Sequence, residues 1–236
     1  MVHRQTEAVA QHLKPLGWKY ITLDDCWGGE RLANGSYSWD PVRFPSGMPA
    51  LAAFVKSRGL ELGLYMAAGN QTCNQGGRPY HIPGSFRRYT EDAATLVGWG
   101  VTYIKLDWCG SFPPLAQGSP EEMRLKPRMF AEFSEVIPAV VMLQHAGVAA
   151  VCSCPQRKLC GQALNRTGTP VYLSGSSALC DWEDNVYPPE FHACEWAPKA
   201  LNAWRIGGDH HDWWCSFSPP LNVEKRPRKR PRSTDL

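Results

Sequence analysis

The chain has 236 residues, 43% of them hydrophobic, which is enough for one sizeable core or two small ones. Its formal net charge is only +3, and six of its 25 Lys and Arg residues lie between Lys225 and Arg232, so the charge says little about the rest of the chain. No run of about 18 apolar residues occurs, so we expect no membrane-spanning helix, and we find no secretory signal in this chain.

Three features of the composition nevertheless stand out. The chain has nine cysteines and three glycosylation sequons, at Asn34, Asn70 and Asn165, which favour a compartment outside the cytosol. Its ten tryptophans suit either the stacking of sugar rings or ordinary core packing, and composition does not separate the two roles.

The first half of the chain alternates amphipathic helices with short apolar strands. Helices are expected over residues 3–15, 48–57 and 89–99, and strands over residues 18–23, 60–66 and 101–109. Three repeats of strand and helix predict right-handed βαβ units and a parallel sheet. No Gly-x-Gly-x-x-Gly motif follows any strand, so a dinucleotide-binding fold has no support.

Polar residues end each of these three strands. Asp24 and Asp25 follow the first, Tyr65 closes the second, and Lys105 and Asp107 close the third. Because side chains alternate along a strand, Lys105 and Asp107 are expected to share a face. For the same reason the adjacent Asp24 and Asp25 are expected to point to opposite faces. One of these two carboxylates would face the axis of a barrel, and the other would anchor a loop. A solvated turn is the alternative for the Asp-Asp pair. Chemistry at the same end of successive strands favours a (β/α)8 barrel and makes Asp107 a candidate nucleophile.

The second half of the chain is less regular. Residues 111–127 are expected to form a loop with a weak helix start, and residues 130–151 a helical or mixed segment that Pro138 interrupts. A strand is expected over residues 170–174, a helix over 194–204, and a further strand that ends in Asp209.

Two other segments of the second half resemble binding motifs only weakly. Cys152, Cys154 and Cys160 lack a fourth ligand, so we expect no zinc site there. Residues 222–236 alternate Lys, Arg and Pro, which is typical of a disordered tail, with a nucleic-acid patch as the alternative.

Taken in order, the motifs of this chain resemble the retaining α-galactosidases and α-N-acetylgalactosaminidases of glycoside hydrolase family 27. The motifs that carry the resemblance are Leu23-Asp-Asp-Cys-Trp27, Asp40-Pro-Val-Arg-Phe-Pro-Ser-Gly47, Gly59-Leu-Glu-Leu-Gly-Leu-Tyr65, Gln71-Thr-Cys73, Pro83-Gly-Ser85, Trp99-Gly-Val101, Lys105-Leu-Asp-Trp-Cys109, Ala163-Leu-Asn-Arg-Thr-Gly168 and Trp204-Arg205 followed by Asp209. They cover about residues 1–110 and 161–214.

The resemblance implies an incomplete (β/α)8 TIM barrel. Relatives have a strand before the first helix and further barrel units and a β-sandwich after the last match, and we expect this chain to lack them. The expected organisation is a partial catalytic barrel over residues 1–216, with an unmatched insertion near 134–160, and a basic tail over 217–236. Five strands do not close an eight-stranded barrel.

The resemblance also assigns roles to residues. Asp107 matches the nucleophile and Asp209 the general acid/base, while Cys73 and Cys109 match a disulfide beside the site; no metal or cofactor is implied. The residues that match sugar contacts are Asp24, Asp25, Tyr65, Lys105, Asp181, Trp182 and Arg205. Retaining hydrolysis needs two carboxyl groups about 5–5.5 Å apart, with the acid initially protonated. Lys105 is expected to keep Asp107 ionised, although a barrel-mouth salt bridge is the alternative for this pair.

The implied function is hydrolysis of terminal α-D-galactosyl residues of oligosaccharides or glycoconjugates by double displacement. Asp181 favours galactose over N-acetylgalactosamine, because an acidic residue there would bind a hydroxyl group. The alternatives are an α-N-acetylgalactosaminidase or a β-L-arabinopyranosidase of the same family, or an inactive, truncated sugar-binding remnant. The expected partner is a glycan or small-molecule substrate, with no nucleic acid or membrane partner. Family resemblance places the protein in a secreted, vacuolar or lysosomal setting.

Overall fold

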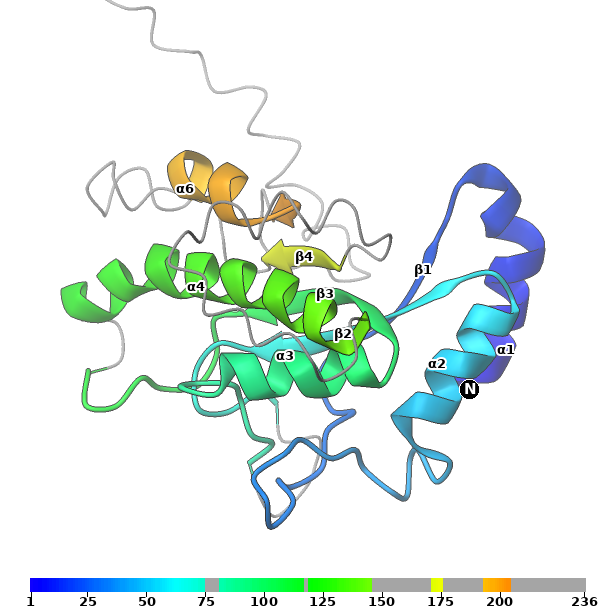
Figure 1. Cartoon of the computed structure of the whole chain (residues 1–236), viewed down its shortest axis with the longest axis horizontal. Coiled ribbons are helices and arrows are strands. Elements are labelled where there is room, and N and C mark those ends of the chain that lie inside the picture. Colours follow the sequence, from blue (N-terminus) through cyan, green and yellow to red (C-terminus); the bar gives the residue numbers. More distant parts are fainter. Residues whose placement is uncertain (75–80, 117–118, 146–170, 176–192, 205–236) are drawn as a thin grey trace, which may run out of the picture.

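The described part of the computed structural model is built around one curved parallel sheet (Figure 1). The structure describes residues 1–74, 81–116, 119–145, 171–175 and 193–204. Its strands are β1 (Tyr20–Leu23), β2 (Glu61–Ala67), β3 (Val101–Asp107), β4 (Tyr172–Gly175) and β5 (Ala203–Trp204). They lie in chain order, β1-β2-β3-β4-β5, and every neighbouring pair is parallel.

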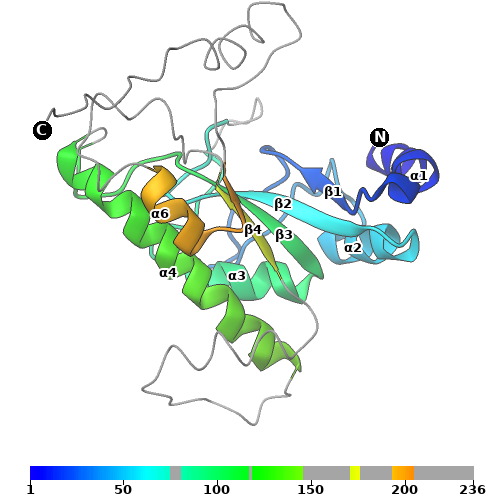
Figure 2. The same ribbon diagram turned by 90° about the horizontal axis from the view of Figure 1, so that it is seen from above.

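The helices between these strands follow one another around the outside of the sheet (Figure 2). They are α2 (Gly47–Ser57), α3 (Tyr89–Gly98), α4 (Pro120–His145) and α6 (Ala193–Ala200). Helix α3 packs against α4, and α4 packs against α6. Connections between consecutive parallel strands are right-handed in nearly all proteins, which places successive helices on one face of the sheet, as in a barrel and unlike a doubly wound sheet. The sheet therefore confirms the prediction of an incomplete (β/α)8 barrel.

The main core lies between the sheet and these helices. Leu64 of β2, Ile104 and Leu106 of β3, Leu96 of α3 and Phe130 of α4 are all fully buried there. Burying one such side chain stabilises the fold by about 1.5–3 kcal/mol. The alternation of these residues along β3 leaves Lys105 and Asp107 on the opposite, inner face.

The N-terminal helical segment is more irregular than its sequence suggests. Helix α1 (Val2–Ala8) continues as a π-helical turn (Val9–Leu13) and a 3-10 turn (Lys14–Leu16). Gly17 ends the segment in the left-handed conformation, with φ of 98°. The strand then begins at Tyr20 rather than at residue 18, so that Trp18 remains 60% exposed.

Helix α4 corrects the sequence prediction for residues 111–138. The helix starts at Pro120 and runs without interruption to His145, passing through Pro138. The weak helix start predicted within residues 111–127 is a capped helix terminus, since the Ser119 hydroxyl accepts a hydrogen bond from the Glu122 N–H at 3.2 Å. An internal proline costs about 3 kcal/mol, and the burial of several large apolar side chains offsets that cost. These side chains are Met129, Phe130 and Phe133.

Among the described helices, none combines the length and the apolarity needed to cross a membrane. Several sequence predictions fall outside the described residues. They concern the cysteines at 152–160, the part of the last predicted strand beyond Trp204 and the basic tail.

Candidate functional site

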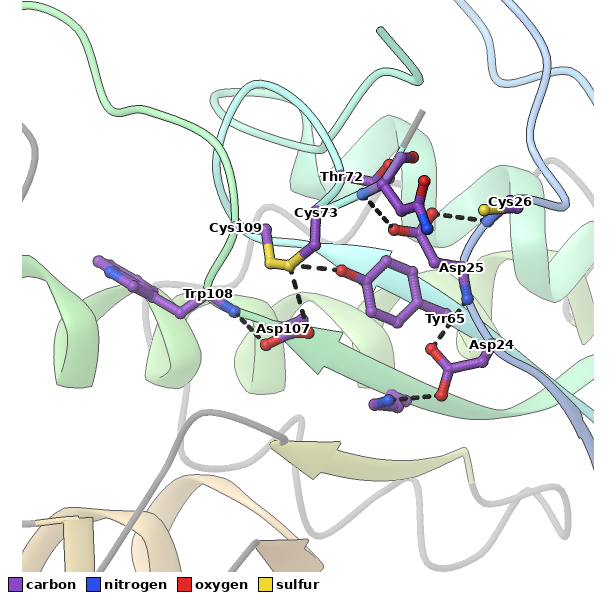
Figure 3. Close-up of a disulfide and its surroundings, with 11 residues drawn as sticks. Asp24, Asp25, Cys26, Tyr65, Thr72, Cys73, Asp107, Trp108 and Cys109 are labelled. Atoms are coloured by element: carbon purple, nitrogen blue, oxygen red, sulfur yellow. Dashed lines mark hydrogen bonds and ion pairs between the residues drawn. A yellow bond between two sulfur atoms is a disulfide. The ribbon is translucent and has the colours of Figure 1, made fainter. Parts of the chain in front are cut away.

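The polar residues predicted at the strand ends do lie together at the carboxyl edge of the sheet (Figure 3). Tyr65 of β2 is paired in register with Lys105 of β3, and Ala67 with Asp107. The Tyr65 ring lies between Asp107 on one side and the Asp24-Asp25 turn on the other (Figure 3). Three consecutive strands thus contribute to one cluster, which we call the strand-end site.

Lys105 and Asp24 form an ion pair across the inner face of the sheet. Lys105 Nζ lies 2.5 Å from Asp24 Oδ2 and 5.3 Å from the centre of the Tyr65 ring. The Asp24 side chain is 67% exposed, so the pair adds at most about 1 kcal/mol to stability. Lys105 shares a face with Asp107 as predicted, but the carboxylate that it pairs with in the structure is Asp24.

Asp25 points away from Asp24 and anchors a loop. Its Oδ2 accepts a hydrogen bond from the Asn74 N–H at 2.8 Å, and its Oδ1 accepts one from the Cys26 N–H at 2.6 Å. Cys26 adopts φ of 72°, an uncommon conformation for a residue other than glycine, and such conformations cluster at functional sites. The predicted division of the two carboxylates, one toward the inner face and one on a loop, is confirmed.

Asp107 lies beside a disulfide. Its Oδ1 accepts a hydrogen bond from the Trp108 N–H at 2.8 Å, which orients the carboxylate. Its Oδ2 lies 3.7 Å from Cys73 Sγ, and Cys73 is joined to Cys109, as the resemblance predicted, with the Cα atoms 5.1 Å apart. A disulfide sulfur carries no proton, so this approach is a van der Waals contact.

Tyr65 is a neutral phenol at the centre of the strand-end site. It is only 2% exposed, and burial raises the pKa of its hydroxyl far above the ordinary value, with further increases from the charges of Asp107 and Asp25. Its hydroxyl lies 3.5 Å from Cys109 Sγ, and its backbone carbonyl accepts a hydrogen bond from Trp27 Nε1 at 2.8 Å. Tyr65 is therefore a fixed hydrogen-bond donor beside the Asp107 carboxylate.

A buried ion pair behind the site was not predicted from the sequence. Arg31 holds both carboxylate oxygens of Asp92 at 2.7 Å and also donates to the Gly84 carbonyl at 2.8 Å. The Gly84 N–H in turn donates to the Asn70 carbonyl at 2.9 Å. Arg31 thus ties the loop around Gly84 to the loop that leads into Cys73. Arg31 and Asp92 are 61 positions apart in the sequence, so no local sequence pattern predicts that they pair.

One cluster in the described part of the chain has the make-up of a metal site. The ligand atoms of Cys73, Asp107 and Cys109 all lie within 4.8 Å of one another. Cysteine binds metals as the thiolate, and the two sulfurs are not thiolates while they are bonded to each other. In the oxidised chain the two cysteines therefore form a disulfide cross-link beside Asp107 and no metal site.

The other predicted site residues are not described by the structure. Asp181, Trp182, Arg205 and Asp209 lie outside the described ranges. The roles of Asp209 as acid/base and of the other three as sugar contacts therefore remain predictions from the sequence.

Comparisons with known proteins agree with one another. A family model described as Alpha galactosidase A matches residues 2–128. The α-galactosidase A of Cellvibrio japonicus is 32% identical over 97% of this chain and 46% of its own length, and the human α-galactosidase A is 30% identical over 91% and 39%. The chain spans less than half the length of the curated relatives it matches.

Solved structures show the same similarity. The α-galactosidase of Saccharomyces cerevisiae, solved with raffinose, superposes with a TM-score of 0.59 at 25% identity, covering 89% of this chain and 36% of the yeast chain. α-Galactosidase I from Mortierella vinacea gives a TM-score of 0.59 at 27% identity, covering 89% and 42%.

Proposed function

Because this chain belongs to the α-galactosidase A family, we propose that it is a retaining exo-glycosidase that removes terminal α-D-galactosyl residues. The observation that carries the proposal is the position of Asp107. Its carboxylate ends a central strand, on the inner face, beside a neutral buried phenol and near the Lys105–Asp24 ion pair. A strand end with this set of groups is where a parallel barrel places its chemistry.

In the proposed reaction Asp107 attacks the anomeric carbon and forms a covalent glycosyl intermediate. Asp209 protonates the leaving oxygen and then activates water, for which the two carboxyl groups must be about 5–5.5 Å apart. Tyr65 supports this role of Asp107, because a phenol that stays protonated donates a hydrogen bond without adding charge. The backbone N–H of Trp108 holds the carboxylate in one orientation.

The same proposal gives the sugar contacts to groups around Asp107. Asp24 and Lys105 present a paired carboxylate and ammonium group on the inner face, where the exposed Asp24 side chain is open to a sugar hydroxyl. The proposed set is completed by Asp25, Arg205 and the Asp181-Trp182 pair. Asp181 would favour a sugar with a hydroxyl group at the 2-position over one with an acetamido group there. Among these, Asp25 already accepts two backbone hydrogen bonds, so its role combines sugar contact with holding the loop.

The proposal is tested by hydrolysis of p-nitrophenyl α-D-galactopyranoside by the full chain. We expect turnover, its loss in Asp107→Asn, and no change in Glu7→Gln, which alters an exposed carboxylate on α1. Parallel assays with the α-N-acetylgalactosaminide and the β-L-arabinopyranoside test the choice of sugar. Galactose binding without turnover would instead identify a sugar-binding remnant, and a rate unaffected by Asp107→Asn would refute the proposed nucleophile.

A further inference from the structure

We propose that reduction of the Cys73–Cys109 disulfide converts the strand-end site into a binding site for a thiophilic divalent cation such as Zn²⁺ or Cd²⁺. The ligands are the two cysteine thiolates and the Asp107 carboxylate, with water in the fourth position. All three side chains already converge, since their ligand atoms lie within 4.8 Å of one another. Three protein ligands and one open position are a common arrangement for zinc.

The separations fit a single ion. Zinc binds sulfur at about 2.3 Å and carboxylate oxygen at about 2.1 Å, so a tetrahedral site puts the two ligand atoms roughly 3.6 Å apart. Cys73 Sγ and Asp107 Oδ2 are 3.7 Å apart. The sulfurs must part to roughly 3.8 Å once the bond between them is broken. Rotation of the two side chains allows this, because their Cα atoms are 5.1 Å apart.

The backbone around both cysteines is held by contacts that do not depend on the disulfide. The Cys109 carbonyl accepts a hydrogen bond from the Gly69 N–H at 3.0 Å, and Asp25 holds the Asn74 N–H next to Cys73 at 2.8 Å. Reduction therefore frees the sulfurs without releasing the loops that carry them. Cys73 is exposed, which gives an ion a way in.

Tyr65 supplies a partner outside the ligand set. Its hydroxyl lies 3.5 Å from Cys109 Sγ, close enough to donate a hydrogen bond to the thiolate that would bind the metal. Hydrogen bonds of this kind orient metal ligands, and their removal typically costs about 10–100-fold in affinity.

The chemistry balances with one external reactant, a dithiol or phosphine reductant. Reduction transfers two electrons to the sulfur–sulfur bond, and two protons from water give two thiols. Binding of the cation then releases both thiol protons to solvent, while Asp107 coordinates the cation through a carboxylate oxygen. The consequence for catalysis rests on the proposed function: coordination of the Asp107 carboxylate withdraws electron density from both of its oxygens and places the cation where the sugar would bind, so the cation inhibits the reduced chain.

The test is a Cd²⁺ titration of the full chain after phosphine reduction, followed by the ultraviolet thiolate-to-cadmium absorption. We expect the wild-type chain to bind one more equivalent than the double variant Cys73→Ser/Cys109→Ser, since the other seven cysteines are present in both. Asp107→Asn should lower the affinity for that additional Cd²⁺ ion at least about tenfold. Glu7→Gln, which alters an exposed carboxylate on α1 outside the site, should leave that affinity unchanged.

If the reduced wild-type chain and the double variant bind the same number of Cd²⁺ ions, the proposed site is refuted. It is also refuted if Asp107→Asn binds the additional Cd²⁺ ion as tightly as the wild-type chain does. If the double variant fails to fold by circular dichroism, Asp107→Asn decides, because it keeps both cysteines and the shape of the side chain. Hydrolysis is measured separately. The expected Cd²⁺ pattern in a chain without hydrolysis would support the metal site and refute the proposed function, whereas full hydrolysis by the Cd²⁺-loaded chain would overturn the inhibition.

Discussion

The buried Arg31–Asp92 ion pair makes a sharp prediction for stability. In Arg31→Met the Asp92 carboxyl group, which is fully buried, loses its two hydrogen bonds with the guanidinium. Breaking a buried pair by removing one partner costs about 3–5 kcal/mol. The matched control is Arg58→Met, because Arg58 pairs with Glu7 on the surface and such pairs contribute about 0–1 kcal/mol.

The cost of Arg31→Met should also depend on pH. Burial already raises the pKa of Asp92, and hydrogen bonds and charge from Arg31 oppose that rise, so the pKa climbs further without Arg31. An acid whose folded pKa exceeds its unfolded value loses stability as the pH rises through the folded pKa. The destabilisation should therefore be larger near neutral pH than near about pH 3, which lies below the ordinary Asp pKa of about 3.9, so that Asp92 is largely protonated in both states.

The assay is urea unfolding followed by circular dichroism, with the disulfide intact, at the two pH values. The double variant Arg31→Met/Asp92→Leu removes both charges and should be more stable than Arg31→Met alone. If Arg31→Met costs no more than Arg58→Met, or costs the same at both pH values, the ion pair does not hold the loops as we have reasoned.

Two further predictions concern α4 and the buried tyrosines. Ser119→Ala should lower the free energy of unfolding by about 1 kcal/mol by removing the helix cap, and Ser119→Asp should restore it; an unchanged urea midpoint in the alanine variant would contradict the cap. Burial raises the pKa of three tyrosines well above 10.0, namely Tyr37, Tyr65 and Tyr89. Above pH 10 the unfolded chain ionises these phenols while the folded chain keeps them neutral. The free energy of unfolding should therefore hold below pH 10 and fall above it, by about 1.4 kcal/mol per tyrosine and pH unit. Phenolate absorbance from these three should appear only with unfolding, and their ionisation near pH 10 in the folded chain would refute the burial argument.

Much of the fold was predictable because short-range patterns decide it. The periods of apolar residues placed α2, α3, β2 and β3 within a few residues of where they lie. The prediction failed for α4, where Pro138 suggested a break and the burial of Phe130 and Phe133 keeps the helix continuous. Packing of this kind depends on partners distant in the sequence, so local pattern does not reveal it.

The candidate site was predictable to the same extent. Alternation along a strand was enough to separate Asp24 from Asp25 and to put Lys105 and Asp107 on one face. It did not show that Lys105 pairs with Asp24, because the choice between two nearby carboxylates depends on distances across strands. Arg31 escaped notice for a related reason, since its partner belongs to a helix that local sequence does not connect to it.

The most direct test of the central claim is to identify the residue that carries the glycosyl intermediate. The full chain is treated with a fluorinated α-galactosyl fluoride that forms the covalent intermediate quickly and releases it slowly, and its peptides are analysed by mass spectrometry. We predict the fluorogalactosyl mass on the peptide at Asp107, and its absence in Asp107→Asn. A label on another carboxylate, or turnover of galactosides with Asp107 unlabelled, would contradict the assignment of Asp107 as the nucleophile.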